Sequence, residues 1–545
     1  MSYSFNLLER PWIPCLTRQE IVIPLSLRET LARAHELLNI AHESPLVGVS
    51  VMRLLLAVMH RVYGPPDAAS WAILWHSPSF DMAALDRYFD QWRGRFDLFD
   101  AERPFYQDAS CQKEQAGPVS KLMHETVSGN NATLFDHSVD VSPTPVEAAE
   151  AALQLIAHLV FALSGTGTPD SEVAGSKYTG RSPTAKGVIC LVRGDDLRQT
   201  LLLNLRRYHP AQEVPFGGAE DMPAWERLQS AQFRERIPCG WLDLLTWQSR
   251  RTRLFPEGDT LAPTIRYAAV MAGEAVSNSF ALPKKDSMMA WRLLTKARQG
   301  ASPWVSISFR EERAVWRDAY SLFGRFEDQS VRPPILDWIG ELADEVLDAT
   351  HRYALDVAGI CTPEKQVAKV LSWHAESLPL PLTILKQPAL CAQVKKALEM
   401  AKNGEDALQS GTRRLAERLL PPQVRVGREK KDDVSRLVKS LLRLQDYWAG
   451  LQIEFQKFIV DLAAGGLDSI DVDTGRTEAL TGWIRQCRRS ARRSMDLTLR
   501  AVGHGDRTFR AEADAESAFN GTLNQKLPDP EAKKEVVEND TAIAE

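Results

Sequence analysis

The chain has 545 residues, a net charge of −5, 44% hydrophobic residues and 25% charged residues. That length suggests two to four domains, and the composition is typical of a soluble globular protein with a real core. The seven cysteines lie far apart, without a CxxC pair or a paired Cys/His spacing. This spacing argues against a structural zinc site and against a disulfide framework, and it fits a reducing cytoplasm.

Membrane and secretion signals are weak. The most apolar long run, 46–63, contains Arg53, His60 and Arg61, and charges at those depths predict a buried helix rather than a membrane span. The N-terminal stretch lacks the apolar region of a signal peptide. We therefore expect a soluble, cytoplasmic protein.

The first part of the chain mixes short strands with helices. Residues 1–25 are typical of short strands around a turn at Pro11. Between the helical patterns 82–93 and 146–163 lies a long polar stretch, 102–145, without clear periodicity. A segment of that length is usually functional or partly mobile. Apolar residues recur at helical spacing at 27–42, 46–63, 82–93 and 146–163. Strand patterns return at 187–194, 245–255, 265–272 and 303–309.

After residue 366 the strand-like runs end. Helical patterns occupy 366–375, 384–402, 408–420, 431–463 and 475–501, and their short connections with Pro or Gly indicate an antiparallel bundle. The last residues are acidic and poor in apolar side chains, which is typical of disorder. The predicted fold class is mixed, helix-rich α+β. It comprises an N-terminal α/β domain (1–365), a C-terminal helix bundle (366–505) and an acidic, disordered tail (506–545).

Positive charge is concentrated late in the chain. Residues 411–445 hold ten Lys/Arg against four acids, and 476–510 hold nine against three, whereas 511–545 carry nine acids and three lysines. The predicted helix 475–501 has two stripes. The apolar or small stripe consists of Leu480, Trp483, Ile484, Cys487, Ala491, Met495 and Thr498. The other consists of five arginines, Arg485, Arg488, Arg489, Arg492 and Arg493. Guanidinium groups suit phosphate oxygens, so this stripe predicts a contact to a nucleic-acid backbone. The alternative is a solvated face with acidic neighbours.

Motifs of enzymes are mostly absent. The chain has no P-loop, no GxSxG, no HExxH and no GxGxxG, and we expect no cofactor and no metal. The loop 128–138, "SGNNATLFDHS", contains Asp136 and His137, which could form half of a catalytic or metal site. The glycine-bearing loop 174–183 could approach a phosphate closely or be a plain surface turn.

Several stretches together resemble a known family: "FNLLERPWIPC", "ERPFYQ", "SGNNATLFDHS", "LVRGDDLRQTLLLNL", "GWLDLLTWQSRRTRLF" and "RTEALTGWIRQCRRSARR". Their order and spacing are similar to the large subunit of the type I-E CRISPR Cascade surveillance complex. The resemblance covers nearly the whole chain up to about residue 505. It implies a C-terminal bundle of four helices.

The resemblance also implies a recognition subunit rather than an enzyme. Members of this family read the protospacer-adjacent motif (PAM) of duplex DNA from the minor groove and help to start unwinding and R-loop formation, while base pairing with the guide supplies the sequence specificity. Their partners are the crRNA, the backbone, 5′-end-binding and small Cascade subunits, the displaced strand and the effector helicase-nuclease.

Site residues carried over from the family fall on four stretches. A loop that docks near the crRNA 5′ end would use an aromatic anchor beside polar groups. A glycine loop would face the minor groove, a lysine would enter it, and a wedge would open the first base pairs. The docking loop falls on Asn130, Asn131, Phe135, Asp136 and His137, and the glycine loop on Gly175, Ser176 and Lys177. The lysine candidates are Lys284 and Lys285, and the wedge falls on Pro363, Glu364, Lys365 and Gln366.

Two other functions compete with this one. A stand-alone metal-dependent nuclease would use Asp136, His137 and carboxylates such as Asp195 and Asp196. A protein scaffold would use the arginine stripe to bind an acidic protein. Magnesium-dependent cleavage would favour the first, and competition by DNA would count against the second.

Overall fold

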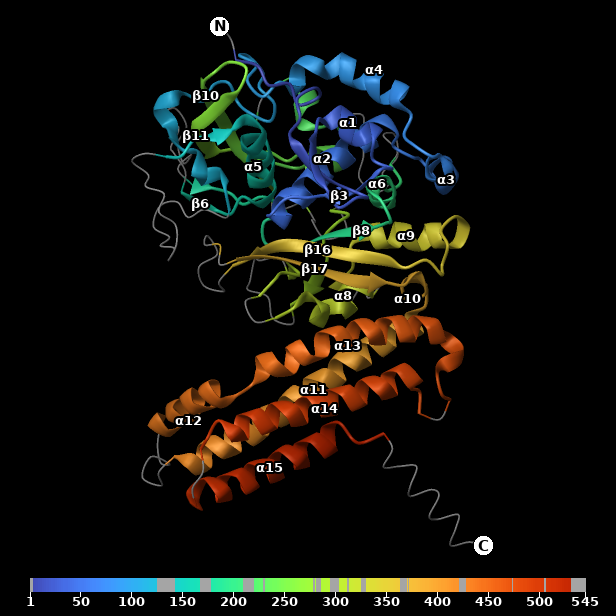
Figure 1. Ribbon diagram of the computed structural model, residues 1–545, viewed down its shortest axis with the longest axis vertical. Coiled ribbons are helices and arrows are strands. Elements are labelled where there is room, and N and C mark those ends of the chain that lie inside the picture. The colour runs from blue at the N-terminus through green and yellow to red at the C-terminus, as the bar shows by residue number, and fades with distance from the viewer. Residues whose placement is uncertain are drawn as a thin grey trace. The chain divides into compact units, whose positions relative to one another are not determined.

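The chain forms two compact units in the computed structural model (Figure 1). The first comprises residues 1–315 and 325–382, and the second comprises 316–324 and 383–545. The residues that the structure describes are 3–124, 143–166, 178–208, 220–228, 231–277, 280, 286–294, 303–310, 313–324, 330–362, 370, 372–420, 428–472, 474–503 and 506–530.

The first unit begins with a three-stranded antiparallel sheet in the order β2-β1-β3, formed by β1 (Ile13–Thr17), β2 (Val22–Leu25) and β3 (Leu37–Ile40). Helix α1 (Leu27–Ala32) starts at a capping box, in which Ser26 and Glu29 each accept a hydrogen bond from the other's backbone amide. The predicted helix 27–42 is therefore wrong beyond α1, because β3 pairs with β1 instead of continuing the helix.

Helix α2 (Pro45–Val62) is a core helix, and fourteen of its eighteen residues are buried. It is the one helix among the described residues that is long and apolar enough to cross a membrane, but 78% of it is buried inside the protein. Its Arg53 is only 2% exposed and forms an ion pair with the fully buried Asp286 at 3.6 Å. The prediction of a buried helix at 46–63 is confirmed.

Two larger sheets complete the framework of the first unit. One has the order β10-β11-β4, with β5 also paired to β11, and the other has the order β17-β16-β8. The strands are β4 (Ala116–Pro118), β5 (Val146–Glu147), β8 (Ile189–Arg193), β10 (Arg250–Gly258), β11 (Pro263–Ala272), β16 (Tyr353–Cys361) and β17 (Ser372–Leu380). The helices are α3 (Ala68–His76), α4 (Met82–Trp92), α5 (Ala148–Phe161), α6 (Leu197–Asn204), α7 (Trp241–Leu245) and α9 (Pro334–Glu345).

Shorter ladders lie beside these sheets. They pair β6 (Gly165–Thr166) with β7 (Tyr178–Thr179), β9 (Arg234–Arg236) with β12 (Glu274–Val276), and β13 (Trp291–Leu293) with both β14 (Trp304–Ser306) and β15 (Ser330–Val331). The predicted mixed α+β fold is confirmed, and its strands are short and distributed over several sheets.

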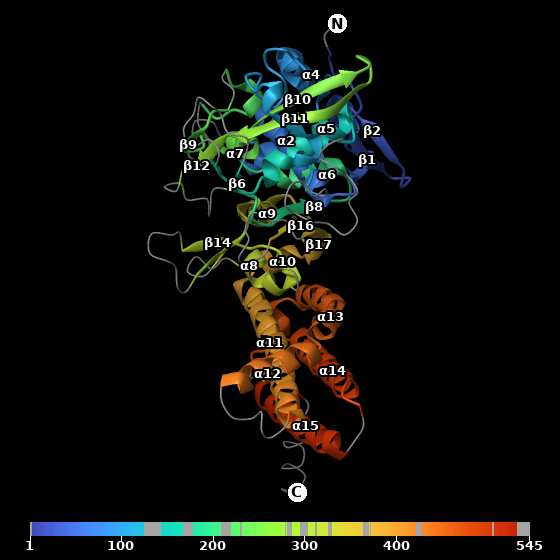
Figure 2. The ribbon, with the colours of Figure 1, turned by 90° about the vertical axis from the view of Figure 1, so that its left-hand side faces the viewer.

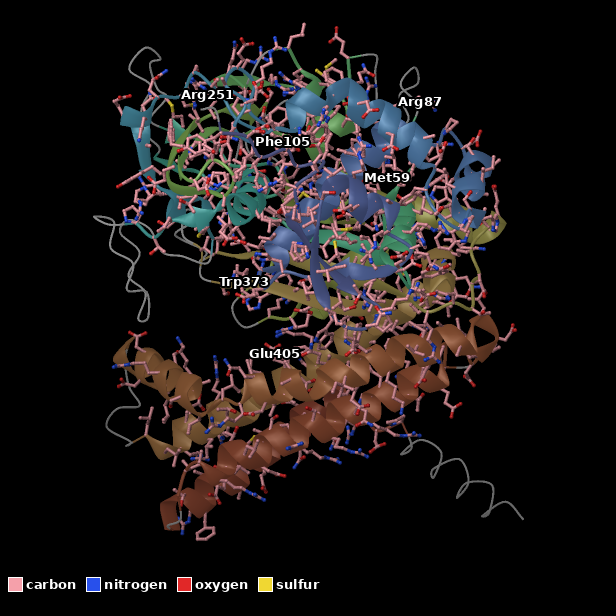
Figure 3. The ribbon with its side chains drawn as sticks, turned by 45° about the horizontal axis from the view of Figure 1, so that its top comes forward. Met59, Arg87, Phe105, Arg251, Trp373 and Glu405 are labelled. Atoms are coloured by element: carbon pink, nitrogen blue, oxygen red, sulfur yellow. The ribbon has the colours of Figure 1, made fainter. Side chains whose placement is uncertain are left out.

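The edge of β10 is covered by residues 106–111. Asp108 accepts a hydrogen bond from the side chain of Arg251 (labelled in Figure 3) at 2.7 Å, and its backbone amide donates to the Thr252 carbonyl at 2.8 Å. Arg253 donates to the carbonyl of Cys111 at 3.0 Å. Covering an edge in this way prevents pairing with other chains.

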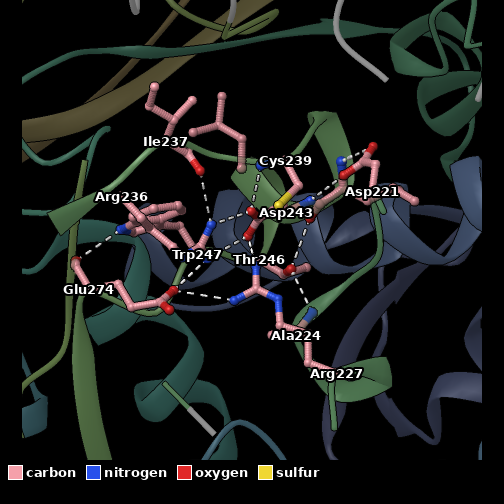
Figure 4. A network of polar contacts seen from close by, with 12 residues as sticks. Asp221, Ala224, Arg227, Arg236, Ile237, Cys239, Asp243, Thr246, Trp247 and Glu274 are labelled. Atoms are coloured by element: carbon pink, nitrogen blue, oxygen red, sulfur yellow. Dashed lines mark hydrogen bonds and ion pairs between the residues drawn. The ribbon is translucent and has the colours of Figure 1, made fainter. Parts of the chain in front are cut away.

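A buried ionic network ties β9, β12 and α7 together (Figure 4). Arg236 forms a bidentate pair with Asp243 and also contacts Glu274, and its guanidinium lies 4.1 Å from the centre of the Trp247 ring. Arg227 pairs with the same two acids. Burial alone would raise the pKa of Glu274, but the hydrogen bonds and charges of Arg236, Arg227 and Arg234 together outweigh it and hold that pKa below its usual value.

Asp221 fixes the start of α7. Its carboxylate accepts hydrogen bonds from the Tyr208 hydroxyl at 2.7 Å and from the backbone amides of Leu242 and Asp243 at 3.1 and 2.9 Å. Gly240 allows this close approach, because a Cβ at that position would overlap the Asp221 carboxyl group.

The second unit is an antiparallel helix bundle (Figure 2). The long α11 packs against α12, α13, α14 and α15, and α13 packs against α14. The short α8 and α10 also belong to it, apart from Leu382. The bounds are α8 (Ala319–Phe323), α10 (Leu382–Lys386), α11 (Pro388–Leu419), α12 (Arg428–Leu441), α13 (Leu444–Gly465), α14 (Glu478–Arg500) and α15 (Asp506–Lys526).

Aromatic residues form the centre of the bundle. Trp316 stacks on Phe455 with ring centres 4.6 Å apart and meets Trp483 edge-on. The neighbouring Arg317 lies over the Trp448 ring and pairs with Glu405, labelled in Figure 3, at 3.3 Å. These contacts explain why residues 316–324 belong to this unit although they precede it in sequence.

The boundary between the units lies at Thr383, not at 366. Residues 372–380 form β17, which pairs with β16 along its whole length, so the predicted helix 366–375 is wrong for its described C-terminal part. The predicted helices 384–402 and 408–420 form one helix, α11, from residue 388 on, whereas residues 384–386 belong to α10. Gly404 lies inside α11 because the Tyr447 hydroxyl occupies the space of a Cβ and donates to the Ala401 carbonyl at 2.6 Å.

The prediction of a disordered tail over 506–545 is wrong for its first part. Residues 506–526 form α15, which packs along α11 and buries Ala511, Ala515, Phe519 and Leu523. These residues recur at helical spacing, and α11 supplies the apolar surface that they cover. The last fifteen residues, 531–545, lie outside the described residues.

We expect Gly240→Ala to destabilise the first unit by about 1–3 kcal/mol, the usual cost of overpacking. The reason is the overlap of the new methyl group with the Asp221 carboxyl group. Urea unfolding followed by circular dichroism measures the loss.

Gly48→Ala is the matched control in the same unit. The nearest atom to a Cβ at Gly48, in α2, lies at 3.9 Å, which is ordinary contact, and alanine is favoured over glycine in a helix by about 1 kcal/mol. Equal midpoints for the two variants would contradict the proposed role of Gly240.

Candidate nucleic-acid interface

Most residues predicted to contact nucleic acid lie outside the described part of the chain. These are the docking-loop residues Asn130, Asn131, Phe135, Asp136 and His137, the glycine-loop residues Gly175, Ser176 and Lys177, the candidates Lys284 and Lys285, and the wedge residues Pro363, Glu364, Lys365 and Gln366. Their roles stay predictions. The arginine stripe is described, and so are the elements that flank each of the four stretches.

Helix α14 has the predicted amphipathic pattern. Thr477 caps it by accepting a hydrogen bond from the Leu480 amide at 3.1 Å. Its buried face contains every apolar or small residue that the spacing predicted: Leu480, Trp483, Ile484, Cys487, Ala491, Met495 and Thr498.

The opposite face of α14 exposes four of the five predicted arginines, Arg485, Arg489, Arg492 and Arg493. Within the described part of the chain, the structure gives Arg489, Arg492 and Arg493 no ion pair. Arg500 extends the row and Asp496 interrupts it. Like charges at helical spacing repel one another, so a polyanion laid over this face would relieve the repulsion.

Arg488 does not belong to this face. It is 5% exposed, and its guanidinium donates to the Leu527 carbonyl and to the Asn524 side chain at 2.9 Å, with Asp529 at 3.6 Å. Burial lowers its pKa, with a further contribution from the charge of Arg492. The prediction that Arg488 contacts a nucleic-acid backbone is wrong, because a helix unseen in the sequence pattern covers that position.

The acids of α15 neutralise a different set of bases. Asp514 pairs with Arg418 at 2.5 Å and lies 3.9 Å from Arg414, both on α11. At the other end of α15, Lys526 pairs with Asp406 of α11 at 2.6 Å. As far as residue 530, the acidic C-terminal region therefore pairs with residues of α11, and the structure gives it no ion pair with Arg489, Arg492 or Arg493.

The segment 125–142, which contains the predicted docking loop, starts and ends on ordered contacts. His124 stacks on His158 of α5 with ring centres 5.8 Å apart, and burial holds the pKa of His158 well below its usual value. At the other end, Arg266 of β11 donates to the Pro143 carbonyl at 2.8 Å. Both ends thus rest on the β11 sheet and α5.

The segment 167–177, which contains the predicted glycine loop, connects β6 to β7. The two strands pair at Gly165–Thr179 and Thr166–Tyr178. The guanidinium of Arg250 donates to the carbonyls of Leu163 and Gly180, which flank this ladder. One side chain therefore holds both ends of the connection.

The lysine candidates and the wedge have equally defined neighbours. Asp286 directly follows Lys285, and its carboxylate caps the turn by accepting from the Met288 amide at 2.9 Å. The wedge lies in the connection from β16 to β17, whose ladder ends at the pair Cys361–Ser372. Glu376 of β17 accepts from the Val315 amide at 2.8 Å.

The carboxylates named for a nuclease are engaged in structural contacts. Asp196 caps α6 by accepting from the Gln199 amide at 2.8 Å and pairs with Arg18 at 3.1 Å. Asp195 pairs with His351 at 3.3 Å. Across the described residues there is no group of three His, Cys, Asp or Glu that could hold a metal ion.

The sequence analysis missed Arg250, the burial of Arg488 and the helix α15. A signal for Arg250 exists: along β10, Arg250, Thr252 and Leu254 alternate onto the buried face, whereas Arg251 and Arg253 do not. An arginine in register with a core leucine indicates a buried guanidinium. No comparable signal distinguishes Arg488 from its exposed neighbours.

Comparison with known proteins gives matches over most of the chain. The sequence pattern of the family "CRISPR-associated protein Cse1" matches residues 6–494. CRISPR-associated protein CasA/Cse1 of Thermus thermophilus is 31% identical over 536 residues, which cover 96% of this chain and 98% of that protein. A crystal structure of Thermus thermophilus CasA superposes with a TM-score of 0.78 at 28% identity, covering 96% of this chain and 99% of that one. A chain of a solved CRISPR RNA-guided surveillance complex shares the fold, with a TM-score of 0.73, 21% identity and coverage of 95% and 99%.

We expect Arg488→Met to release the C-terminal end of α15. Methionine fills the site but cannot donate to Leu527 and Asn524, and a buried carbonyl left unpaired costs about 1–3 kcal/mol. Tryptic cleavage after Lys526, which ends α15, measures the release.

Arg489→Met, next in sequence and exposed, is the control and should leave cleavage unchanged. If both variants are cleaved at the wild-type rate, Arg488 does not hold α15.

Proposed function

The chain belongs to the Cse1 family of CRISPR-associated proteins, and from this premise we propose that it is the large, non-catalytic subunit of a type I-E Cascade complex. The observation that carries the proposal is the family match, which runs from residue 6 to 494 and so spans both units. In this role the chain recognises the PAM of duplex DNA in the minor groove, starts unwinding and R-loop formation, and contributes to recruiting the effector helicase-nuclease.

The proposed partners follow from this role. They are the crRNA, the backbone, 5′-end-binding and small Cascade subunits, PAM-bearing duplex DNA and the displaced strand. The fold shared with a chain of a CRISPR RNA-guided surveillance complex supports assembly with protein and RNA. The complex acts in the cytoplasm, where its nucleic-acid partners are.

The contacts to DNA are assigned to three connections of the first unit. Gly175, Ser176 and Lys177 face the minor groove, Lys284 or Lys285 enters it, and residues 363–366 form the wedge. The flanking residues support the assignment, because each connection leaves a fixed framework: the Arg250 contacts, the buried Asp286 and the β16–β17 ladder. A wedge needs such a framework, since splitting a base step costs a few kcal/mol.

The exposed arginines of α14 bind the DNA backbone. Three of them have no acidic partner among the described residues, and a row of guanidinium groups matches phosphates through paired hydrogen bonds. Backbone contacts position a nucleic acid without reading its sequence. This division agrees with PAM reading in the first unit and strand holding in the second.

We expect Phe135→Ala to weaken joining of the chain to the other Cascade subunits and crRNA, because the docking loop would lose its aromatic anchor. Co-purification measures joining. Affinity for PAM-bearing and PAM-scrambled duplexes, measured on the wild-type assembly, tests PAM recognition. A wild-type chain that neither joins nor changes DNA discrimination would overturn the proposed function.

We expect Arg489→Gln, Arg492→Gln and Arg493→Gln together to weaken DNA binding by the complex and to flatten its salt dependence. Each lost phosphate contact reduces the slope of log K against log salt by about 0.9 for duplex DNA or 0.7 for a single strand, so the loss of three contacts changes the slope by about 2 to 3. Titrations at several salt concentrations measure it.

A control of equal net charge is Lys402→Gln, Arg414→Gln and Lys526→Gln. These three bases already pair with acids of α11 or α15. Equal salt slopes for the two triple variants would show that the α14 face has no special role.

A further inference from the structure

We propose that Arg250 is a positioning residue for DNA recognition, which fixes both ends of the β6–β7 connection from the interior of the first unit. This inference rests on the proposed function, because that connection contains Gly175, Ser176 and Lys177. Arg250 itself does not reach the DNA; it acts through the backbone that it holds.

The hydrogen bonds of Arg250 go to the two residues that flank β6 and β7. The side chain belongs to β10 and is 4% exposed. One terminal nitrogen donates to the Gly180 carbonyl at 2.6 Å and to the Ser249 carbonyl at 2.8 Å, and the other donates to the Leu163 carbonyl. Leu163 precedes β6 and Gly180 follows β7, so one planar group sets the distance between them.

The charge of Arg250 is not compensated by an acid. Within the described part of the chain it has no ion pair, and burial alone lowers its pKa to about 10. An unpaired buried charge destabilises a protein unless polar groups surround it, and here the carbonyls of Leu163, Gly180 and Ser249 accept its hydrogen bonds. The contacts with Leu163 and Gly180 explain why an arginine occupies this core position.

The backbone on which Arg250 stands is itself fixed. Gly273 donates to the Ser249 carbonyl at 3.1 Å, and a Cβ on Gly273 would lie 2.6 Å from the Gln248 carbonyl oxygen and 2.8 Å from the Arg250 nitrogen. On the other side, Gly180 approaches Ala275 of β12 to within contact distance of a Cβ. Two glycines thus allow β10, β12 and the end of the connection to pack closely.

The residues that follow β7 are also attached to the end of α5. The Ser182 amide donates to the Ala162 carbonyl at 2.8 Å, and the Thr184 hydroxyl donates to the Val160 carbonyl. A positive charge near the last carbonyls of a helix is favourable, which suits Arg250 at Leu163. The connection therefore begins and ends on one helix terminus, and Arg250 joins both ends.

Another buried arginine offers a matched control. Arg198 of α6 is 9% exposed and donates to the carbonyls of Leu74 and Trp75 at 3.3 and 3.0 Å, at the end of α3. It also donates to two backbone carbonyls from a buried position, but these carbonyls lie at the end of α3 and do not flank β6 or β7. Loss of Arg198 should reduce stability without changing DNA discrimination.

The experiment compares wild type, Arg250→Met, Arg250→Lys and Arg198→Met in the assembled complex. The readout is the ratio of affinities for PAM-bearing and PAM-scrambled duplexes. We expect Arg250→Met to reduce the ratio about tenfold, the discrimination typical of contacts to one base pair, with scrambled-DNA affinity unchanged. Arg250→Lys should retain part of the ratio, because an ammonium group can still donate to one or two carbonyls. If Arg250→Met does not assemble, Arg250→Lys replaces it in the comparison.

Hydrogen exchange at Ser182 and at residues 165 and 180 is measured in parallel on the free chain, and it should rise in Arg250→Met but not in Arg198→Met. An unchanged ratio in Arg250→Met, or an equal loss in Arg198→Met, would overturn the positioning role, and so would unchanged exchange. If the wild-type complex shows no discrimination, the proposed function is wrong, and exchange alone then decides whether Arg250 holds the connection.

Discussion

Guanidinium groups that donate to backbone carbonyls hold the irregular parts of this protein in place. Arg250 joins the residues on either side of β6 and β7, Arg198 closes the end of α3, and Arg488 holds the end of α15. Several short strands and long connections leave many carbonyls without partners in a ladder, and each must be satisfied when buried. An arginine satisfies two or three at once and fixes their spacing, because its donors lie in one rigid plane.

Contacts between neighbouring helices also explain the distribution of charge in the bundle. The net charge of the chain is slightly negative, yet its acids and bases are sorted by helix. Asp514 of α15 pairs with Arg414 and Arg418 of α11. Asp529, which follows α15, pairs with Arg488. Among the described residues, Arg489, Arg492 and Arg493 have no ion pair. The exposed row of arginines on α14 therefore depends on which bases the neighbouring helices neutralise, and it does not follow from net charge.

Where sequence reasoning succeeded, a single element contained the signal. The apolar stripe of α14 was predicted residue by residue, because helical spacing alone separates its two faces. The burial of α2 was predicted from the charged residues within its apolar run. It failed where a distant partner decides the outcome. Residues 37–40 and 372–380 are strands because β1 and β16 pair with them, Gly404 does not break α11 because Tyr447 packs on it, and Arg488 is buried because α15 covers it. The family resemblance, which rests on ordered stretches along the whole chain, is confirmed, while the residues that it assigns to the four connections remain predictions.

The amino-acid sequence by itself determined the family, the mixed α+β class, the helical second half and the arginine stripe, because these depend on local periodicity and on the order of motifs. Only the tertiary structure decided which arginines of that stripe face solvent, that the acidic region contains a helix, and that Arg250 donates to the residues on either side of β6 and β7. The physical reason is that burial and hydrogen bonding belong to pairs of residues far apart in the chain. Leu163, Gly180 and Arg250 carry no pattern that links them, and they meet only when α5, β7 and β10 pack together.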